Sequence, residues 1–295
     1  DLGLWLFIFG IINLMSNQLT GRIIVPKIGT RNIIMIGTAI LAICPLLLVI
    51  VDSYILFMAI AFPFGAAIGF VIPSNQTQIS HIENITEKIY TPIYQACFSA
   101  GSLSGALMAA YVIRQDIHPE ITFSVMAVII LLSVIVIYFL GLPKSEESND
   151  PIVKFEFPKR NIFIFGILLM FNFATIGIII DWSSLWLTRD LMAPLFLGGL
   201  VIVFFNAGEI VARLFASSFI DWFGEKIVGG YLSVLGAIIL FVSILTSNLN
   251  FIIPALVLFG LFTANFIAIV IRQAIKVTTD PIPLTVSNLT TLGFS

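Results

Sequence analysis

Long apolar runs, separated by short polar stretches, make up almost the whole chain. A run of about 20 apolar residues is long enough to cross a bilayer as a helix. The pattern therefore predicts spans near 3–25, 33–51, 54–79, 88–113, 121–141, 161–185, 193–216, 228–246 and 251–274, and one more that begins near 283. Short strands of alternating polarity, as in an outer-membrane barrel, are not visible. The expected fold class is an all-α polytopic membrane protein.

The composition supports this expectation. Of the 295 residues, 59% are hydrophobic and 10% are charged, whereas about 25% of the residues in a soluble domain are charged. The natural solvent of such a chain is lipid, and its net charge of −2 gives no indication of a nucleic-acid partner. Cys44 and Cys97 both fall inside predicted spans, so no disulfide framework is expected.

Basic residues gather on one side of the alternating topology, and that side is cytoplasmic by the positive-inside rule. Only Arg114 and Arg189 fall on the other side. The long polar segment 142–160 is cytoplasmic, and the expected location is the bacterial inner membrane. The residues on the cytoplasmic side are Arg22, Lys27, Arg31, Lys88, Lys144, Lys154, Lys159, Arg160, Arg213, Lys226, Arg272 and Lys276.

The loop after the first span recurs 195 residues later. Gly21–Arg31 reads GRIIVPKIGTR, and Ala216–Lys226 reads ASSFIDWFGEK, so that Gly29 maps onto Gly224 and Arg31 onto Lys226. The same offset carries Phe64-Gly65 onto Phe259-Gly260. Repeats of this kind are common in transporters. The chain is therefore expected to consist of related halves, 1–141 and 161–295, joined by the linker 142–160.

The repeat also indicates absent segments. The span at 161–185 has no partner before residue 1, and the partners of 121–141 and of the end of 88–113 would lie beyond residue 295. The chain is expected to be a fragment that lacks a first helix and a C-terminal end.

A loop of the form G-x-x-x-D-R-x-G-x-R between the second and third helices is typical of the major facilitator superfamily, and both repeat loops resemble it. The first copy has Pro26 where Asp is usual and Gly21 one place early, whereas the second copy keeps the acid as Asp221. The resemblance implies two pseudo-symmetric halves of six helices, of which helices 2–6, 7–10 and the start of 11 are represented. It also implies a role in holding one side closed for Gly29, Lys27, Arg31, Arg213, Asp221, Gly224 and Lys226.

Further runs resemble one branch of the superfamily, the fucose-permease and MosC-like (rhizopine transporter-like) transporters. Asn75 followed by Glu83, then Pro92 and the run Phe98–Gly105, is similar to their fourth and fifth helices. Gly177–Ser183 is similar to their seventh helix and Leu289–Gly293 to the start of their eleventh. Ile176 replaces a common Glu and Gln95 a common His, so any proton coupling would differ from that of relatives with those groups.

Charged side chains inside spans are costly and need a reason. Glu209 shares one helical face with Asn206 and Arg213. It is either a proton or substrate site or one member of a structural Glu209–Arg213 ion pair. Asp181, beside Trp182, either takes part in proton or substrate binding or is an interfacial acid next to a belt tryptophan.

Neutral polar residues are spread over several spans. Asn13, Ser16, Asn17 and Thr20 form a stripe that either lines an aqueous cavity or bonds neighbouring helices. Amides that offer donors and acceptors suit polyhydroxy ligands, although single amides also serve helix packing. The candidate substrate-binding residues are Asn13, Asn17, Asn75, Gln95, Asn172, Asn206 and Asn265. Gly101 and Gly105 are expected to permit close helix packing.

Enzyme functions find little support. His81 and His118 lie on opposite sides of the membrane without a ligand cluster, and no phosphate-binding Gly-rich loop is present. No cofactor or metal is expected.

The best-supported interpretation is a monomeric secondary transporter that takes up a small polar solute, such as a sugar, by alternating access, with or without protons. Export of a drug or metabolite by the same fold is one alternative. A membrane-embedded solute sensor is another.

Overall fold

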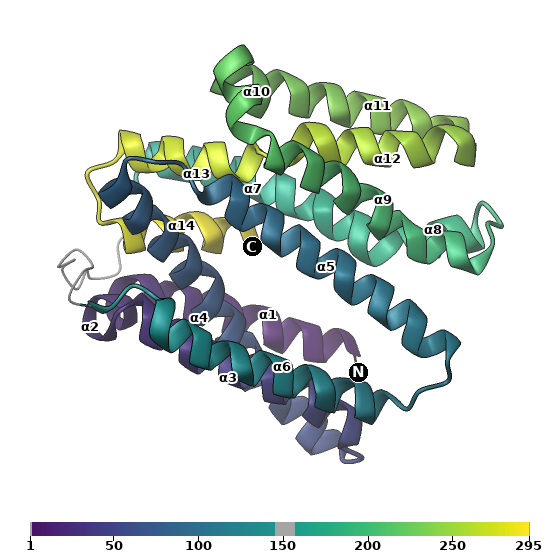
Figure 1. Cartoon of the computed structure of the whole chain (residues 1–295), viewed down its shortest axis with the longest axis horizontal. Helices are drawn as coiled ribbons and strands as arrows, with labels where there is room; N and C mark the ends of the chain where they lie inside the picture. The colour runs from purple at the N-terminus through teal and green to yellow at the C-terminus, as the bar shows by residue number, and fades with distance from the viewer. Residues whose placement is uncertain (1, 145–156, 295) are drawn as a thin grey trace. The chain divides into compact units, whose positions relative to one another are not determined.

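A computed structural model describes residues 2–144 and 157–294, without the side chains of Leu2, Ala110, Ile113, Arg114, Asp181, Leu195, Phe196 and Gly199. Over these ranges the chain forms helices and π-helical turns joined by short loops, with no strand (Figure 1). In the described residues, 7 helices are long and apolar enough to cross a membrane, or up to 8 if a bent pair forms one span. The expected all-helical membrane fold is confirmed. Most of the 142–160 linker lies outside the described residues.

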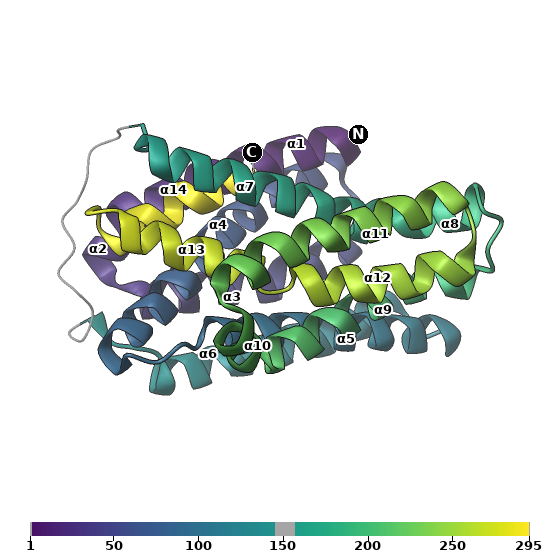
Figure 2. The ribbon, with the colours of Figure 1, turned by 90° about the horizontal axis from the view of Figure 1, so that it is seen from above.

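The helices group into two compact units, and the first comprises residues 1–88, 116–167 and 274–295. In this unit α1 packs on α4, α3 packs on α4 and α6, and α14 packs on α1, η1 and α4 (Figures 1 and 2). The unit also holds the start of α7. Its elements are α1 (Leu2–Leu19), the π-helical turn η1 (Thr20–Ile24), α2 (Val25–Ile28), α3 (Thr30–Ile50), α4 (Tyr54–Thr86), α6 (Pro119–Leu140) and α14 (Ile282–Phe294). Helix α7 (Arg160–Gly177) is divided between the units after residue 167.

The second unit comprises residues 89–115 and 168–273. Here α9 packs on α12 and α5, and α11 packs on α12, around an apolar core that includes Phe205, Phe259 and Leu256. The remaining elements are α5 (Thr91–Arg114), η3 (Ile178–Trp182), α8 (Ser183–Arg189), α9 (Leu195–Leu214), α10 (Ala216–Phe223), η4 (Ile227–Tyr231), α11 (Leu232–Thr246), α12 (Leu249–Thr263) and α13 (Phe266–Val277).

The units do not follow the order of the sequence. Helix α5 precedes the linker but packs on α9, which follows it, and α14 follows the linker but packs on α1. Each unit thus contains a helix that is distant in sequence from most of its members.

The offset of 195 recurs in the backbone and in the hydrogen bonds. Gly29 has φ 83° and ψ 159°, and Gly224 has φ 80° and ψ 155°. Glycine suits both positions because a side chain disfavours positive φ. Gln78 Nε2 donates to Thr30 Oγ1 at 2.8 Å, and Gln273, 195 positions later, donates to Glu225, which lies 195 positions after Thr30. The two loops related by the offset of 195 therefore share one turn geometry and one side-chain contact.

On the N-terminal side of the glycine turn, the first half contains one residue more than the second. A Cβ at Gly65 would lie 2.5 Å from the carbonyl oxygen of Phe9, and a Cβ at Gly260 would lie 2.2 Å from that of Phe205. The glycines are 195 positions apart, but the phenylalanines are 196 apart. The π-helical turn η1 lies between Phe9 and Gly29, and a π-turn accommodates one extra residue in a helix. This insertion explains why Gly21 stands one place early.

Close approach of α9 and α12 predicts that Gly260→Ala is destabilising. The added Cβ would collide with the backbone of α9, and overpacking of this kind costs about 1–3 kcal/mol. The thermal unfolding midpoint in detergent micelles should fall by a few degrees. Gly230→Ala is the matched control, because nothing lies within 4 Å of its Cβ position. Equal effects of both substitutions would contradict the assigned packing.

Candidate functional site

A buried ion pair joins α9 to α5 in the second unit. Arg213 Nη2 donates to Glu209 Oε1 at 2.7 Å, and Nη1 donates to Glu209 Oε2 at 3.0 Å. Ser99 Oγ of α5 donates to Glu209 Oε2 at 2.7 Å, and the guanidinium of Arg213 also donates to Ser99 Oγ. Glu209 is 5% exposed and Arg213 3%. Glu209 thus has the partner that the ion-pair interpretation of the sequence predicts.

The guanidinium of Arg213 extends this network to backbone carbonyls. Its Nη1 donates to the carbonyl oxygen of Gln95 at 3.0 Å, and its Nε donates to that of Ala264 at 3.2 Å. Helices α5 and α9 and the α12–α13 junction are therefore held by one side chain. Buried charges are tolerated when they are paired and hydrogen-bonded in this way.

The other predicted amides of the second unit do not converge on one point. Asn206 Nδ2 donates to Ser102 Oγ of α5 at 3.2 Å. Asn265 Nδ2 donates to the carbonyl oxygen of Ala212 at 3.2 Å, while its Oδ1 is buried without a partner. Asn172 Oδ1 on α7 is also buried without a partner. Gln95 contributes only its backbone oxygen, which accepts from Arg213.

The first unit has a corresponding polar contact between α1 and α14. Asn17 Oδ1 accepts from Ser287 Oγ at 3.1 Å and from Thr290 Oγ1 at 3.0 Å. Beside it, Gln18 Nε2 donates to Thr291 Oγ1 at 2.8 Å. Asn17 therefore bonds a neighbouring helix, which is one of the two roles that the sequence offered for it. That helix, α14, lies 270 or more positions away in the sequence.

An arginine and a glutamine strengthen the α1–α14 contact. Arg22 Nε donates to Gln18 Oε1 at 2.8 Å, and Arg22 Nη2 donates to Asn288 Oδ1 at 3.1 Å. The spacing of Gln18 and Arg22 is that of Glu209 and Arg213, four residues along one helix face. Sequence reasoning missed Gln18, Asn288 and Ser99. They could have been sought by the rule that a polar group within a membrane span needs a hydrogen-bond partner inside the protein.

Asn13 and Asn17 occupy positions equivalent to those of Glu209 and Arg213. The backbone N of Asn13 lies 3.3 Å from the Cβ position of Gly65, and that of Glu209 lies 3.2 Å from the Cβ position of Gly260. With the shift of 196 that applies before η1, Asn17 corresponds to Arg213. The same places in the repeat thus hold a neutral pair in one unit and a charged pair in the other.

Several buried polar atoms of the first unit have no hydrogen-bond partner among the described residues. Asn13 Oδ1 and Asn17 Nδ2 belong to α1, Ser74 Oγ and Gln76 Nε2 to α4, and Thr285 Oγ1 to α14. These three helices pack on one another. A buried polar atom without a partner costs about 1–3 kcal/mol. We call this set of atoms, which is spread over the three helices, the orphan polar cluster; in a membrane protein such groups mark places where polar molecules bind or pass.

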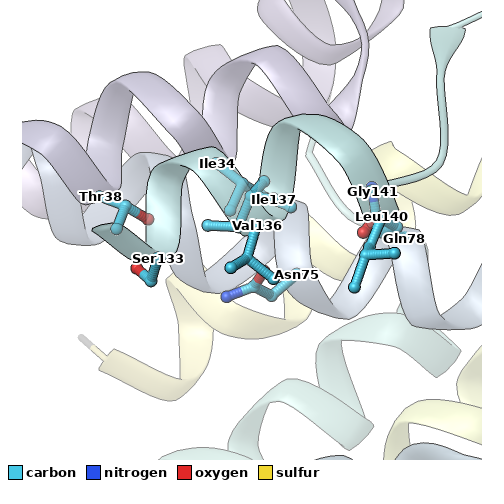
Figure 3. Close-up of a pocket in the computed structure, with 9 residues that line it drawn as sticks. All are labelled: Ile34, Thr38, Asn75, Gln78, Ser133, Val136, Ile137, Leu140 and Gly141. Carbon is cyan, nitrogen blue, oxygen red and sulfur yellow. The ribbon is translucent and has the colours of Figure 1, made fainter. Parts of the chain in front are cut away.

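Asn75 lies apart from the orphan polar cluster, in a groove lined by α3, α4 and α6. Figure 3 shows its side chain beside Ile137 and Val136 of α6. The structure therefore does not bring together Asn75 and the other predicted amide positions of this unit.

Residues of the repeat loops make local contacts. Arg31 donates to the carbonyl oxygen of Tyr138 at 3.4 Å, and Lys226 lies 5.8 Å from the ring centre of Tyr231. Lys27 and Asp221 are exposed. Glu225, not Asp221, forms the ion pair of the second loop, with Arg272 at 3.2 Å. The side chain of Asp181 lies outside the description.

The buried ion pair predicts a large loss of stability when one partner is removed. Glu209→Ala leaves the Arg213 guanidinium buried without its counter-charge, and breaking such a pair costs about 3–5 kcal/mol. The thermal unfolding midpoint in detergent should fall markedly. Replacing both residues, with Glu209→Leu and Arg213→Met, should recover most of the loss. A double variant as unstable as the single one would show that the hydrogen bonds of Arg213 to the Gln95 and Ala264 carbonyls outweigh its pairing with Glu209.

Comparisons with known proteins agree with this architecture. The family model for the Major Facilitator Superfamily matches residues 1–280. An uncharacterized MFS-type transporter of Yersinia pestis is 26% identical over 303 residues, which cover 100% of this chain and 76% of that protein.

Solved structures give the same result for the fold. The human organic anion transporter MFSD10 superposes with a TM-score of 0.74 at 15% identity, over 99% of this chain and 74% of that one. The E. coli fucose:proton symporter FucP superposes with a TM-score of 0.70 at 13% identity, over 99% of this chain and 80% of that one. At these identities the likeness concerns the fold alone. Because the family model spans nearly the whole sequence, the chain belongs to the major facilitator superfamily.

Proposed function

We propose that this major facilitator transporter takes up a small polar solute, such as a sugar or sugar-like compound, by alternating access coupled to protons. The observation that carries the proposal is the orphan polar cluster of α1, α4 and α14. Amide and hydroxyl groups offer both donors and acceptors, which suits a neutral ligand rich in hydroxyl groups. In the proposed orientation the 142–160 linker is cytoplasmic and the protein acts as a monomer in the inner membrane.

Asn13 and Asn17 are the proposed solute contacts in the first unit. Asn17 is fully buried, and its Nδ2 is left over after its Oδ1 has accepted bonds from Ser287 and Thr290. Asn13 makes no hydrogen bond through its side chain to any described residue, and its Oδ1 is buried. A bound hydroxyl group would satisfy both amides. We extend the proposal to Gln95, Asn172, Asn206 and Asn265 in the second unit.

Glu209 is the proposed proton carrier, with Asp181 as a second candidate. A proton on Glu209 would cancel its charge and weaken its pairing with Arg213, which also bonds Ser99 and the Gln95 carbonyl on α5. Protonation would thus change the contact between α5 and α9. This is a direct physical link between a proton and helix packing.

Uptake with protons is tested with cells that produce the protein, suspended in weak buffer, by recording external pH while pools of sugars and polyols are added. We expect alkalinisation with one pool, because each solute molecule would enter with a proton. Glu209→Gln or Asp181→Asn should abolish it. Asp190→Asn, at an exposed acid beyond α8, is the control and should leave it unchanged.

A pH that does not change with any pool would contradict proton symport of these solutes and would favour export or uncoupled transport. Solute binding by purified protein, without movement into liposomes under any gradient, would instead favour a sensor.

The two asparagines predict different outcomes on substitution by leucine. Asn13→Leu should weaken uptake without lowering the unfolding midpoint, because its amide has no described partner to lose. Asn17→Leu should lower both, because it removes the acceptor of Ser287 and Thr290. The measurements are initial uptake rates against solute concentration and thermal unfolding in detergent. Unchanged uptake by Asn13→Leu would remove that residue from the solute site.

A further inference from the structure

A groove on the first unit lies apart from the orphan polar cluster and has no role in the transport proposal. It occupies about 340 Å³ between α4 and α6, over α3. Figure 3 shows Thr38 and Ser133 at one end of it and Gln78 and Gly141 at the other, with Asn75 between them. Apart from Ser133, the residues that line its α6 side are apolar.

The α6 wall belongs to a helix with the surface of a lipid-facing span. Ala127 is the one buried residue that the structure describes in α6. Val136 is 54% exposed and Leu140 is 81% exposed, and both line the groove. In a major facilitator protein these outward apolar side chains face hydrocarbon. The groove is therefore open to the molecules that surround a membrane protein, namely lipids.

A positive charge stands at the Gly141 end of the groove. The side chain of Arg31 packs against Gly141, with its Cγ 2.8 Å from the Cβ position of that glycine. Its guanidinium lies 5.5 Å from the centre of the Tyr138 ring, and its Nε is buried with no hydrogen-bond partner in the part of the chain that the structure describes. A second cation, Lys144, follows three residues after Gly141. Basic pockets between helices on the cytoplasmic side suit anionic headgroups.

The polar groups inside the groove fit the region below a headgroup. Gln78 uses its amide N–H for Thr30, which leaves its carbonyl oxygen as an acceptor. Asn75 makes no side-chain hydrogen bond within the described residues, so its amide is available to donate. Beyond it the groove continues past Ile137 towards mid-span. From the Gly141 end inwards, the groove thus offers the cation of Arg31, the amide donor of Asn75 and the apolar side chains of α6.

We propose that this groove binds an anionic phospholipid. The phosphate pairs with Arg31, an ester carbonyl accepts from Asn75, and an acyl chain lies along Ile137 and the neighbouring wall of α6. A free phosphate would use the arginine alone and would leave the groove beyond it unfilled. The inference does not depend on the transported solute or on proton coupling.

The experiment uses the purified protein in liposomes that contain a trace of phosphatidylglycerol with a diazirine in its acyl chain. After illumination, the labelled peptides are identified and quantified by mass spectrometry. We expect labelling of the segment Ser133–Gly141. Arg31→Gln should lower it about fivefold, the factor that corresponds to about 1 kcal/mol for one basic side chain at a membrane surface. Arg160→Gln, at an exposed arginine of α7, is the matched control and should have no effect.

A second variant tests the groove itself, since Ser133→Phe fills its inner end without changing any charge. It should also reduce labelling, while helix content and elution volume stay unchanged. Added inorganic phosphate should not compete. The proposal is overturned by equal labelling from phosphatidylcholine with the same diazirine, by competition from phosphate, by no effect of Arg31→Gln, or by undiminished labelling in Ser133→Phe.

Discussion

The requirement that a polar group within a bilayer find its partner inside the protein organises both units. There is no water in the hydrocarbon core to satisfy an amide or a guanidinium. In the first unit Asn17, Gln18 and Arg22 meet this requirement on α14, and in the second unit Glu209 and Arg213 meet it on α5. In each case a helix that is distant in the sequence is fixed by hydrogen bonds rather than by apolar packing alone, because lipid tails compete well for apolar contacts.

The equivalent positions of the repeat have different chemistry. Asn13 and Asn17 are neutral whatever the proton concentration, whereas Glu209 and Arg213 carry charges that a proton or the membrane potential acts upon. The neutral positions retain unused hydrogen-bonding capacity, but Glu209 is paired on both carboxylate oxygens. The proposed function accordingly assigns the solute to the neutral positions and the response to protons to the charged pair.

Much of the fold could be predicted from the sequence because hydropathy and glycine leave strong local signals. The spans, the repeat and the glycine turns of the two repeat loops are of this kind. The site could be predicted only in part. Asn17 and Glu209 were identifiable as polar residues in apolar helices. Their hydroxyl-bearing partners were not, because a single Ser or Thr in a span is not unusual in the sequence, and Thr290 is 273 positions from Asn17. The sequence also could not show which glycines permit close helix packing. Within its unit, no atom lies within 4 Å of the Cβ position of Gly101, whereas that of Gly260 is in contact with α9.

The π-helical turn η1 has a consequence for aligning the two halves of the chain. An alignment of the halves without gaps at the offset of 195 sets Asn13 against Gly208 and Asn17 against Ala212. Both pairings are wrong by one position, because Asn13 and Glu209 lie at the same place relative to Gly65 and Gly260. The extra residue lies within a helix rather than in a loop, so the correspondence is found from the contacts of Gly65 and Gly260 and not from a constant offset.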